Sequence, residues 1–212
     1  RALLGHAGPV SGVAFRPDGT RCLTGSWDQT ALLWDAGTGR RLATLAGHQS
    51  QVLAVAYSPD GKTCATGSAD RTAIVWDVQT GQKRLTLTGH TLDVAAVAFR
   101  ADGRQVATGS WDMTARTWDV ATGRALLTLQ PGSVSAVAYS PDGARLLTGS
   151  EDGSAALWDA ETGRRLGQFR GHTAFVTSVA FSRDGRRFAT GSSDQTAVVW
   201  DAQDGRKLLV LR

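Results

Sequence analysis

The chain has 212 residues, of which 42 % are apolar and 20 % charged, and it carries a formal net charge of +4. This composition is typical of a globular domain and excludes a disordered or fibrous chain. No apolar run reaches the roughly 18 residues of a membrane span, and no signal-peptide pattern occurs. We therefore expect a cytoplasmic protein without a membrane segment.

An internal repeat covers nearly the whole chain. Thr-Gly-Ser and Asp-Gly each recur once per unit, and Gly-His occurs in every unit except the fourth. Trp-Asp closes the third predicted strand of each unit. These series stay in register and divide the chain into a leading segment, 1–4, and the units 5–46, 47–88, 89–130, 131–170 and 171–212.

Each unit is predicted to form four short strands. In the first unit, the apolar runs predict strands at 10–15, 22–26, 31–34 and 42–46. The Asp-Gly turn between the first two runs is a hairpin signal, because glycine accepts the positive φ that this turn requires. No segment shows the 3.6-residue period of a helix. We therefore predict an all-β fold.

The order Gly-His, Pro-Asp-Gly, Thr-Gly-Ser, x-Asp-x-Thr and Trp-Asp resembles the WD-repeat family of β-propellers. The resemblance implies five four-stranded antiparallel blades, in a closed ring or in an arc of a larger ring. Members commonly have seven blades. Residues 1–4 align with the end of a fourth strand, and both chain ends fall at a repeat boundary. We therefore expect a piece of a longer protein, or a truncated or engineered chain.

The resemblance also implies a structural tetrad that joins the Gly-His imidazole, a strand threonine, a turn aspartate and the repeat tryptophan. In isolation, these residue types could suggest a hydrolytic triad. Near-identical copies in four units instead favour scaffolding, so we predict no catalytic residue, metal or cofactor. The predicted sets are His6, Thr24, Asp28 and Trp34; His48, Thr66, Asp70 and Trp76; His90, Thr108, Asp112 and Trp118; and His172, Thr190, Asp194 and Trp200.

The fourth unit departs from this pattern. Its loop before the first strand is two residues shorter and lacks Gly-His, although Thr148, Asp152 and Trp158 persist. The tetrad therefore cannot form there. Two interpretations stay open: a weaker blade, or a notch in one face that admits a partner.

Three further residues attract attention. Cys22 and Cys64 occupy the same strand position in neighbouring units, where blade packing would separate their Cα atoms too far for a disulfide, so we expect two reduced core thiols. Arg116 replaces an apolar strand residue. It needs a carboxylate partner or an outward path, because an unpaired buried charge is costly.

Trp27 and Trp111 lie outside the repeated tryptophan series. Their counterparts in the other units vary, so the fold does not demand tryptophan there. The resemblance places the Gly-His and x-Asp-x-Thr loops on one face, called the top, which similar domains use for binding. We predict a protein or peptide partner bound by top-face residues Trp27, Trp111, Pro9, Gln51, Ala69, Asp93, Ser133, Glu151, Phe175 and Ser193.

Other functions are weighed against this non-catalytic scaffold. The arginine bias is typical of bacterial sequences, where similar arrays form the sensor or regulatory part of a larger signalling protein, such as a kinase or NTPase. A truncated or engineered chain could self-assemble if five blades do not close. The opposite face, called the bottom, is net basic and could attract nucleic acid. Interleaved aspartates and the lack of an aromatic platform disfavour that alternative.

Overall fold

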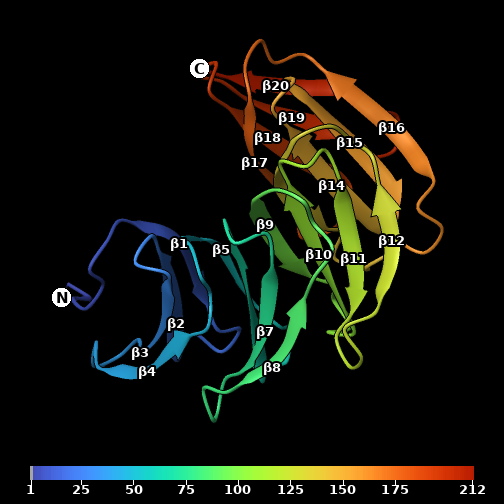
Figure 1. Ribbon diagram of the computed structural model, residues 1–212. Helices are drawn as coiled ribbons and strands as arrows, with labels where there is room; N and C mark the ends of the chain where they lie inside the picture. Colours follow the sequence, from blue (N-terminus) through green and yellow to red (C-terminus); the bar gives the residue numbers. More distant parts are fainter. Residues whose placement is uncertain (1) are drawn as a thin grey trace.

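The computed structural model describes residues 2–212, whose strands form five four-stranded antiparallel sheets, here called blades 1 to 5 (Figure 1). Blade 1 contains β1 (Val10–Phe15), β2 (Arg21–Ser26), β3 (Thr30–Asp35) and β4 (Arg41–Ala46). Blade 2 contains β5 (Val52–Tyr57), β6 (Thr63–Ser68), β7 (Ala73–Asp77) and β8 (Lys83–Leu87). Blade 3 contains β9 (Val94–Phe99), β10 (Gln105–Ser110), β11 (Ala115–Asp119) and β12 (Ala125–Leu129).

The last two blades repeat this order. Blade 4 contains β13 (Val134–Tyr139), β14 (Arg145–Ser150), β15 (Ser154–Asp159) and β16 (Arg165–Arg170). Blade 5 contains β17 (Val176–Phe181), β18 (Arg187–Ser192), β19 (Ala197–Asp201) and β20 (Lys207–Leu211). The all-β prediction is confirmed, and the four strands predicted in the first unit agree with the structure to within one residue at each end.

Side-chain caps fix the bottom turns between strands. In the turn from β1 to β2, Gly19 adopts a φ of 72°, and Asp18 Oδ1 accepts a hydrogen bond from the Thr20 backbone N–H at 3.0 Å. In the turn from β3 to β4, Asp35 Oδ1 accepts one from the Thr38 N–H at 2.7 Å. These short-range bonds explain why the same turn residues recur in each unit.

Neighbouring blades pack face to face, and the hydrophobic cores lie between them. The core between blades 1 and 2 joins Leu23, Leu33 and Leu45 of the first blade to Cys64 and Trp76 of the second. Corresponding cores lie between blades 2 and 3, 3 and 4, and 4 and 5. Both cysteines are free and buried, which confirms the expectation of core thiols.

A glycine in each of the first four blades admits a valine of the next blade. At Gly25, an added Cβ would lie only 2.7 Å from a methyl group of Val52 and of Val55. Gly67, Gly109 and Gly149 face the corresponding valines of the following blades in the same way. The close approach of neighbouring sheets therefore requires the glycine of the Thr-Gly-Ser motif in these blades.

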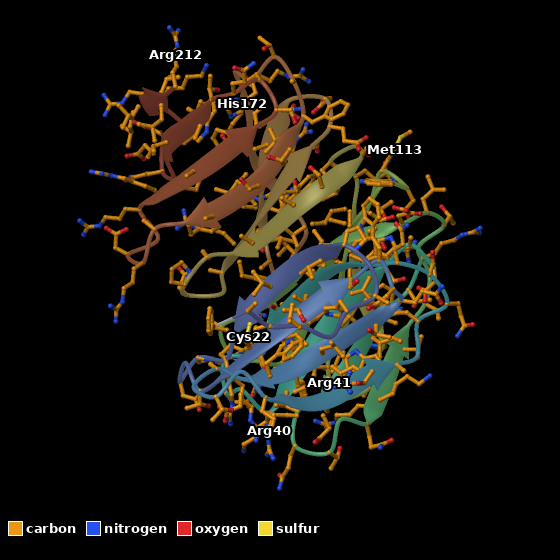
Figure 2. All side chains as sticks on the ribbon, turned by 90° about the vertical axis from the view of Figure 1, so that its left-hand side faces the viewer. Cys22, Arg40, Arg41, Met113, His172 and Arg212 are labelled. Atoms are coloured by element: carbon orange, nitrogen blue, oxygen red, sulfur yellow. The ribbon has the colours of Figure 1, made fainter. Side chains whose placement is uncertain are left out.

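The five blades form an open arc. The inner strands β1, β5, β9, β13 and β17 contact one another in this order along its concave side. In both views, blade 1 and blade 5 lie at opposite ends of the arc (Figures 1 and 2). Of the two arrangements left open by the sequence, the described residues therefore adopt the arc.

Candidate functional site

A hydrogen-bonded network links loop and strands in blade 3. His90 Nδ1 lies 2.8 Å from Asp112 Oδ2, and His90 Nε2 lies 2.7 Å from the Thr108 hydroxyl. The same hydroxyl accepts a hydrogen bond from Trp118 Nε1 at 2.8 Å. The structure thus brings together the four side chains of the predicted tetrad.

The other three tetrads have the same geometry. The distance from the imidazole Nδ1 to the aspartate is 2.7 to 2.9 Å in each of them. The corresponding sets are His6, Asp28, Thr24 and Trp34; His48, Asp70, Thr66 and Trp76; and His172, Asp194, Thr190 and Trp200.

The aspartate of the network is held in its ionised form. Burial by itself would raise the pKa of Asp112, but hydrogen bonds from the Thr114 hydroxyl, the Thr91 backbone N–H and His90 outweigh it and lower the pKa to about 2. The ionised carboxylate accepts a hydrogen bond from the His90 Nδ1–H, which leaves Nε2 as the acceptor for the Thr108 hydroxyl.

Burial lowers the pKa of His90, and the nearby Arg116 adds to that effect, while Asp112 partly opposes it. Both ring nitrogens are already hydrogen-bonded, and the ring is buried. The Thr108 hydroxyl in turn accepts a hydrogen bond from Trp118 Nε1. This arrangement satisfies buried polar groups and leaves none of these atoms directed at a substrate.

Blade 4 holds its tryptophan without a histidine. Trp158 Nε1 still donates to the Thr148 hydroxyl at 3.0 Å, while the Ser133 hydroxyl donates to Glu151 at 2.7 Å. The backbone of the next blade lies over Gly153, where an added Cβ would be 2.8 Å from the His172 carbonyl oxygen. A neighbouring loop therefore covers this turn at Gly153.

Arg116 lies over the ring of Trp118, with its guanidinium carbon 6.0 Å from the ring centroid. Its Nε atom is buried and has no hydrogen-bond partner, and the same holds for the hydroxyl of Thr117. Of the two alternatives that the sequence left open for Arg116, the described salt bridges include no carboxylate partner; its side chain is half-buried, and its guanidinium lies against the face of the tryptophan ring.

The predicted binding residues meet in pairs at the tops of the blades. In blade 1, the Trp27 N–H donates to the Pro9 carbonyl at 3.0 Å, and in blade 3 the Trp111 N–H donates to that of Asp93 at 3.1 Å. The corresponding backbone hydrogen bond joins each of the other three pairs: Ala69 to Gln51, Glu151 to Ser133 and Ser193 to Phe175. Each blade therefore presents one pair of variable side chains at the same place.

The two additional tryptophans are exposed, in contrast to the repeated ones. Trp27 is 49 % and Trp111 41 % exposed, whereas the five tryptophans of the repeated series are at most 6 % exposed. Phe175 is also exposed on blade 5. Large exposed aromatic side chains of this kind are frequent anchors in protein interfaces.

Two top-face residues escaped the sequence reasoning. Leu92 and Met113 are exposed and lie close to Trp111: the Ser110 hydroxyl donates a hydrogen bond to the Leu92 carbonyl, and Met113 follows in the same turn. Figure 2 shows Met113 at the tip of a loop. Both could have been recognised as apolar residues at loop positions that are polar or small in most other units.

The bottom face differs in chemistry from the top. Several of its arginines bind backbone carbonyls of the next blade, as Arg145 does with Ala202 at 3.1 Å and Gly185 at 2.7 Å. Arg16 forms an ion pair with Asp18 at 3.1 Å. The hollows between neighbouring blades on this face are lined by such arginines. Part of the basic charge therefore stabilises the blade junctions.

Two observations concern other classes of site. Within residues 2–212, no group of three His, Cys, Asp or Glu side chains is placed to hold a metal ion. The same residues contain no helix long and apolar enough to cross a membrane.

Comparisons with known proteins agree with the fold. Short stretches are similar to Protein Mut11 of Chlamydomonas reinhardtii (51 % identical over 43 residues) and to the small ribosomal subunit protein RACK1 of Medicago sativa (49 % over 43 residues). A third relative is the dynein assembly factor with WD repeat domains 1 of Danio rerio (44 % over 45 residues). These matches span 20 or 21 % of the chain and only 11 to 13 % of each relative.

Family models cover much more of the chain. The model described as the IFT122 first beta-propeller matches residues 9–158, and the one described as WD domain, G-beta repeat matches residues 163–201. Together they span four blades and most of the fifth. The repeated motifs, the five antiparallel sheets and these matches show that the chain belongs to the WD-repeat β-propeller family.

Proposed function

We propose that this chain is a non-catalytic scaffold that binds a protein or peptide through its top face. The observation that carries the proposal is the exposure of Trp27 and Trp111, which the fold does not need. The proposed surface comprises the five pairs of variable residues together with Leu92 and Met113. Domains of this family typically serve as platforms for protein interaction.

The shape of the surface supports a macromolecular partner. The aromatic side chains project from the top loops, whereas the hollows between blades lie at the bottom and a wide-open hollow runs along the inner strands. Projecting anchors require a partner that supplies the pocket, as a folded protein or a structured peptide does. A small molecule would instead need a concave site that encloses most of its surface.

The compartment and the wider role are part of the same proposal. Two free, buried thiols are compatible with a cytoplasmic location, although blade packing would keep them apart in any compartment. A binding platform of this kind would serve as the recognition part of a larger signalling protein. The nucleic-acid alternative receives less support, because the arginines that bind carbonyls at the blade junctions are less free to contact phosphates.

Capture of partners from a lysate, followed by mass spectrometry, tests the proposal. The wild-type chain and the Trp27→Ala/Trp111→Ala variant serve as baits, and Leu208→Ala/Val210→Ala is a control that removes exposed apolar side chains from the outer strand β20. We expect the tryptophan variant to lose the captured partner and the control to keep it. Equal capture by all three folded baits would contradict the top-face proposal.

A further inference from the structure

Blade 3 differs from the other blades at three positions of its top loops. It holds Leu92, Trp111 and Met113, which are 49 %, 41 % and 65 % exposed. The corresponding residues of the other blades are Gly8, Trp27 and Gln29; Ser50, Ala69 and Arg71; Gly132, Glu151 and Gly153; and Ala174, Ser193 and Gln195. Blade 3 alone combines three large apolar side chains there, and we call them the blade 3 patch.

Two hydrogen bonds hold the loops of the patch together. The Ser110 hydroxyl donates to the Leu92 carbonyl at 3.2 Å, and the Trp111 N–H donates to the Asp93 carbonyl at 3.1 Å. Met113 follows in the same turn, and Figure 2 shows it at the tip of the loop. The three apolar side chains therefore lie close together, as in a site for another macromolecule.

Carboxylates border the blade 3 patch. Asp93 follows Leu92 in the same loop and is half-buried. In the neighbouring blade 4, Glu151 accepts a hydrogen bond from the Ser133 hydroxyl at 2.7 Å, and Asp152 beside it is exposed. Among residues 2–212, the salt bridges give none of these three carboxylates a basic partner. Their charges are therefore free to pair with a bound protein.

The tetrad of blade 3 adds to this negative charge. Asp112 lies between Trp111 and Met113 in the chain and is bound by His90. The pKa of Asp112 is about 2, and burial lowers the pKa of His90. At neutral pH the aspartate is thus ionised and the imidazole is neutral, so the pair carries a net negative charge beneath the patch.

The sign of the charge separates the top loops from the rest of the molecule. Seven acidic residues and one basic residue, Arg71, lie in the top loops of blades 1 to 5, which gives a formal charge of −6, whereas the whole chain has +4. Other basic side chains approach the top from the outer strands: Arg41 and Arg116 lie 3.8 and 2.9 Å from the Cβ positions of Gly5 and Gly89. The top loops therefore favour a positively charged partner.

We propose that the blade 3 patch binds a basic segment of a partner protein, in which lysine or arginine side chains flank an apolar one. This inference rests on the top-face function proposed above and specifies its partner. The apolar side chain packs against Trp111 and Met113, and the cationic groups pair with Asp93 and Glu151. An arginine can also stack on the exposed indole of Trp111.

The same chemistry disfavours other partners. An acidic peptide would bring its carboxylates next to Asp93 and Glu151, where like charges repel one another. A nucleic acid strand would be repelled in the same way, because its binding depends on neutralising phosphates with lysine and arginine. A neutral apolar peptide could contact the patch but would leave the surrounding carboxylates unpaired.

Selection from a library of random peptides displayed on phage tests the proposal. The immobilised wild-type chain is expected to enrich peptides that combine lysine or arginine with an apolar residue. Asp93→Asn/Glu151→Gln removes two charges beside the patch while keeping the size of both side chains, and it should lose the preference for basic residues. The matched control is Asp102→Asn/Glu161→Gln, which makes the same changes at exposed carboxylates on the bottom of blades 3 and 4.

Fluorescence anisotropy with an enriched peptide gives the size of the effect. Each top carboxylate that is neutralised should weaken binding by about two- to fivefold, as for an exposed ion pair, and the bottom control should bind like the wild type. Raising the salt concentration from about 50 mM to about 300 mM should weaken binding to the wild type more than binding to Asp93→Asn/Glu151→Gln, because added salt screens the charges.

A second measurement probes the charge at Trp111 without any peptide. In Trp27→Phe, Trp111 is the one exposed tryptophan, since the five repeated tryptophans are buried. Relative to free N-acetyltryptophanamide, its fluorescence should be quenched more efficiently by caesium than by iodide, because the carboxylates attract cations and repel anions. Adding Asp93→Asn/Glu151→Gln should narrow that difference. Preferential quenching by iodide would overturn the proposal.

The selection separates failure of this inference from failure of the top-face function. Peptides that need Trp27 and Trp111 but are neutral or acidic would overturn the basic partner and leave the top-face function standing. An equal preference for basic residues with Asp93→Asn/Glu151→Gln would also overturn the inference. Peptides that bind the Trp27→Ala/Trp111→Ala variant as well as the wild type, or no enrichment at all, would contradict both.

Discussion

Blades 3 and 4 are neighbours with the same strand order, yet they hold the same buried tryptophan in different ways. In blade 3, the Thr108 hydroxyl joins Trp118 to His90 and, through the imidazole, to Asp112. In blade 4, the Thr148 hydroxyl accepts a hydrogen bond from Trp158 Nε1 and donates one to the Ala156 carbonyl at 3.4 Å.

The comparison separates what the fold requires from what reinforces it. Both blades keep four strands, a buried tryptophan and the bond between indole and threonine. The histidine is dispensable for the sheet, because blade 4 forms its four strands and buries Trp158 without one. The tetrad is therefore a local support for a top loop and is not required for the blade.

The largest expected difference follows from removing the threonine hydroxyl. Thr108→Val leaves two buried groups without a partner, Trp118 Nε1 and His90 Nε2, and should lower the free energy of unfolding by about 2–4 kcal/mol. Thr148→Val leaves only Trp158 Nε1 unpaired, so its cost should be about 1–2 kcal/mol. Urea unfolding of both variants measures this. Equal losses would mean that the histidine adds nothing to blade 3.

A second difference concerns the left-handed position of the top turn. Gly153 has a φ of 80°, whereas Met113 holds the same position in blade 3 with a φ of 68°. Gly153→Ala adds a Cβ against the His172 carbonyl and should cost about 1–3 kcal/mol. Met113→Gly relieves a strained backbone at an exposed site and should stabilise by up to about 1 kcal/mol.

Thermal or urea unfolding can compare these two variants directly. If Gly153→Ala were as stable as the wild type, the loop of blade 5 would not rest on the turn of blade 4.

A third difference concerns how the free energy of unfolding depends on pH. The pKa of His90 is below its ordinary value of 6.5 in the folded chain, so below that pH the unfolded chain binds a proton that the folded chain resists. Stability should therefore fall as the pH drops from 7 to 5, by at most about 1.4 kcal/mol per pH unit for this proton. Blade 4 contributes no such dependence, because it has no histidine.

His90→Gln isolates that contribution. The variant should be less stable at pH 7, and its curve of unfolding free energy against pH should be flatter than that of the wild type. Below pH 4 a further loss is expected in both chains, since the contribution from Asp112 is present above its ordinary pKa of 3.8 and disappears as the pH falls through about 2. Parallel curves from 7 to 5 would contradict the role given to burial.

Much of the fold could be predicted because each unit repeats the same pattern of turns and strands. The Asp-Gly turns and the fixed place of Trp118 and its counterparts predict strands, turns and register without any long-range information. The tetrads followed from the family resemblance, and the structure brings the same side chains together. The openness of the arc could not be predicted, since no local pattern sets the angle between neighbouring sheets.

The candidate surface was less accessible to sequence reasoning. Trp27 and Trp111 could be identified because the register shows that the fold does not need them. Leu92 and Met113 were missed, because their exposure depends on which way a loop turns. The contacts of Arg145 with Ala202 and Gly185 were also hidden, since they join residues 57 and 40 positions apart.

We propose that Trp27 and Trp111 serve a partner, whereas the repeated tryptophans serve the fold. The most direct test is the free energy of unfolding of the Trp27→Ala/Trp111→Ala variant, measured in urea against the wild type. We expect agreement within about 0.5 kcal/mol per site, as for exposed side chains away from packed features. A loss of about 3 kcal/mol or more, typical of a tryptophan removed from a core, would place both residues in the fold and contradict the account.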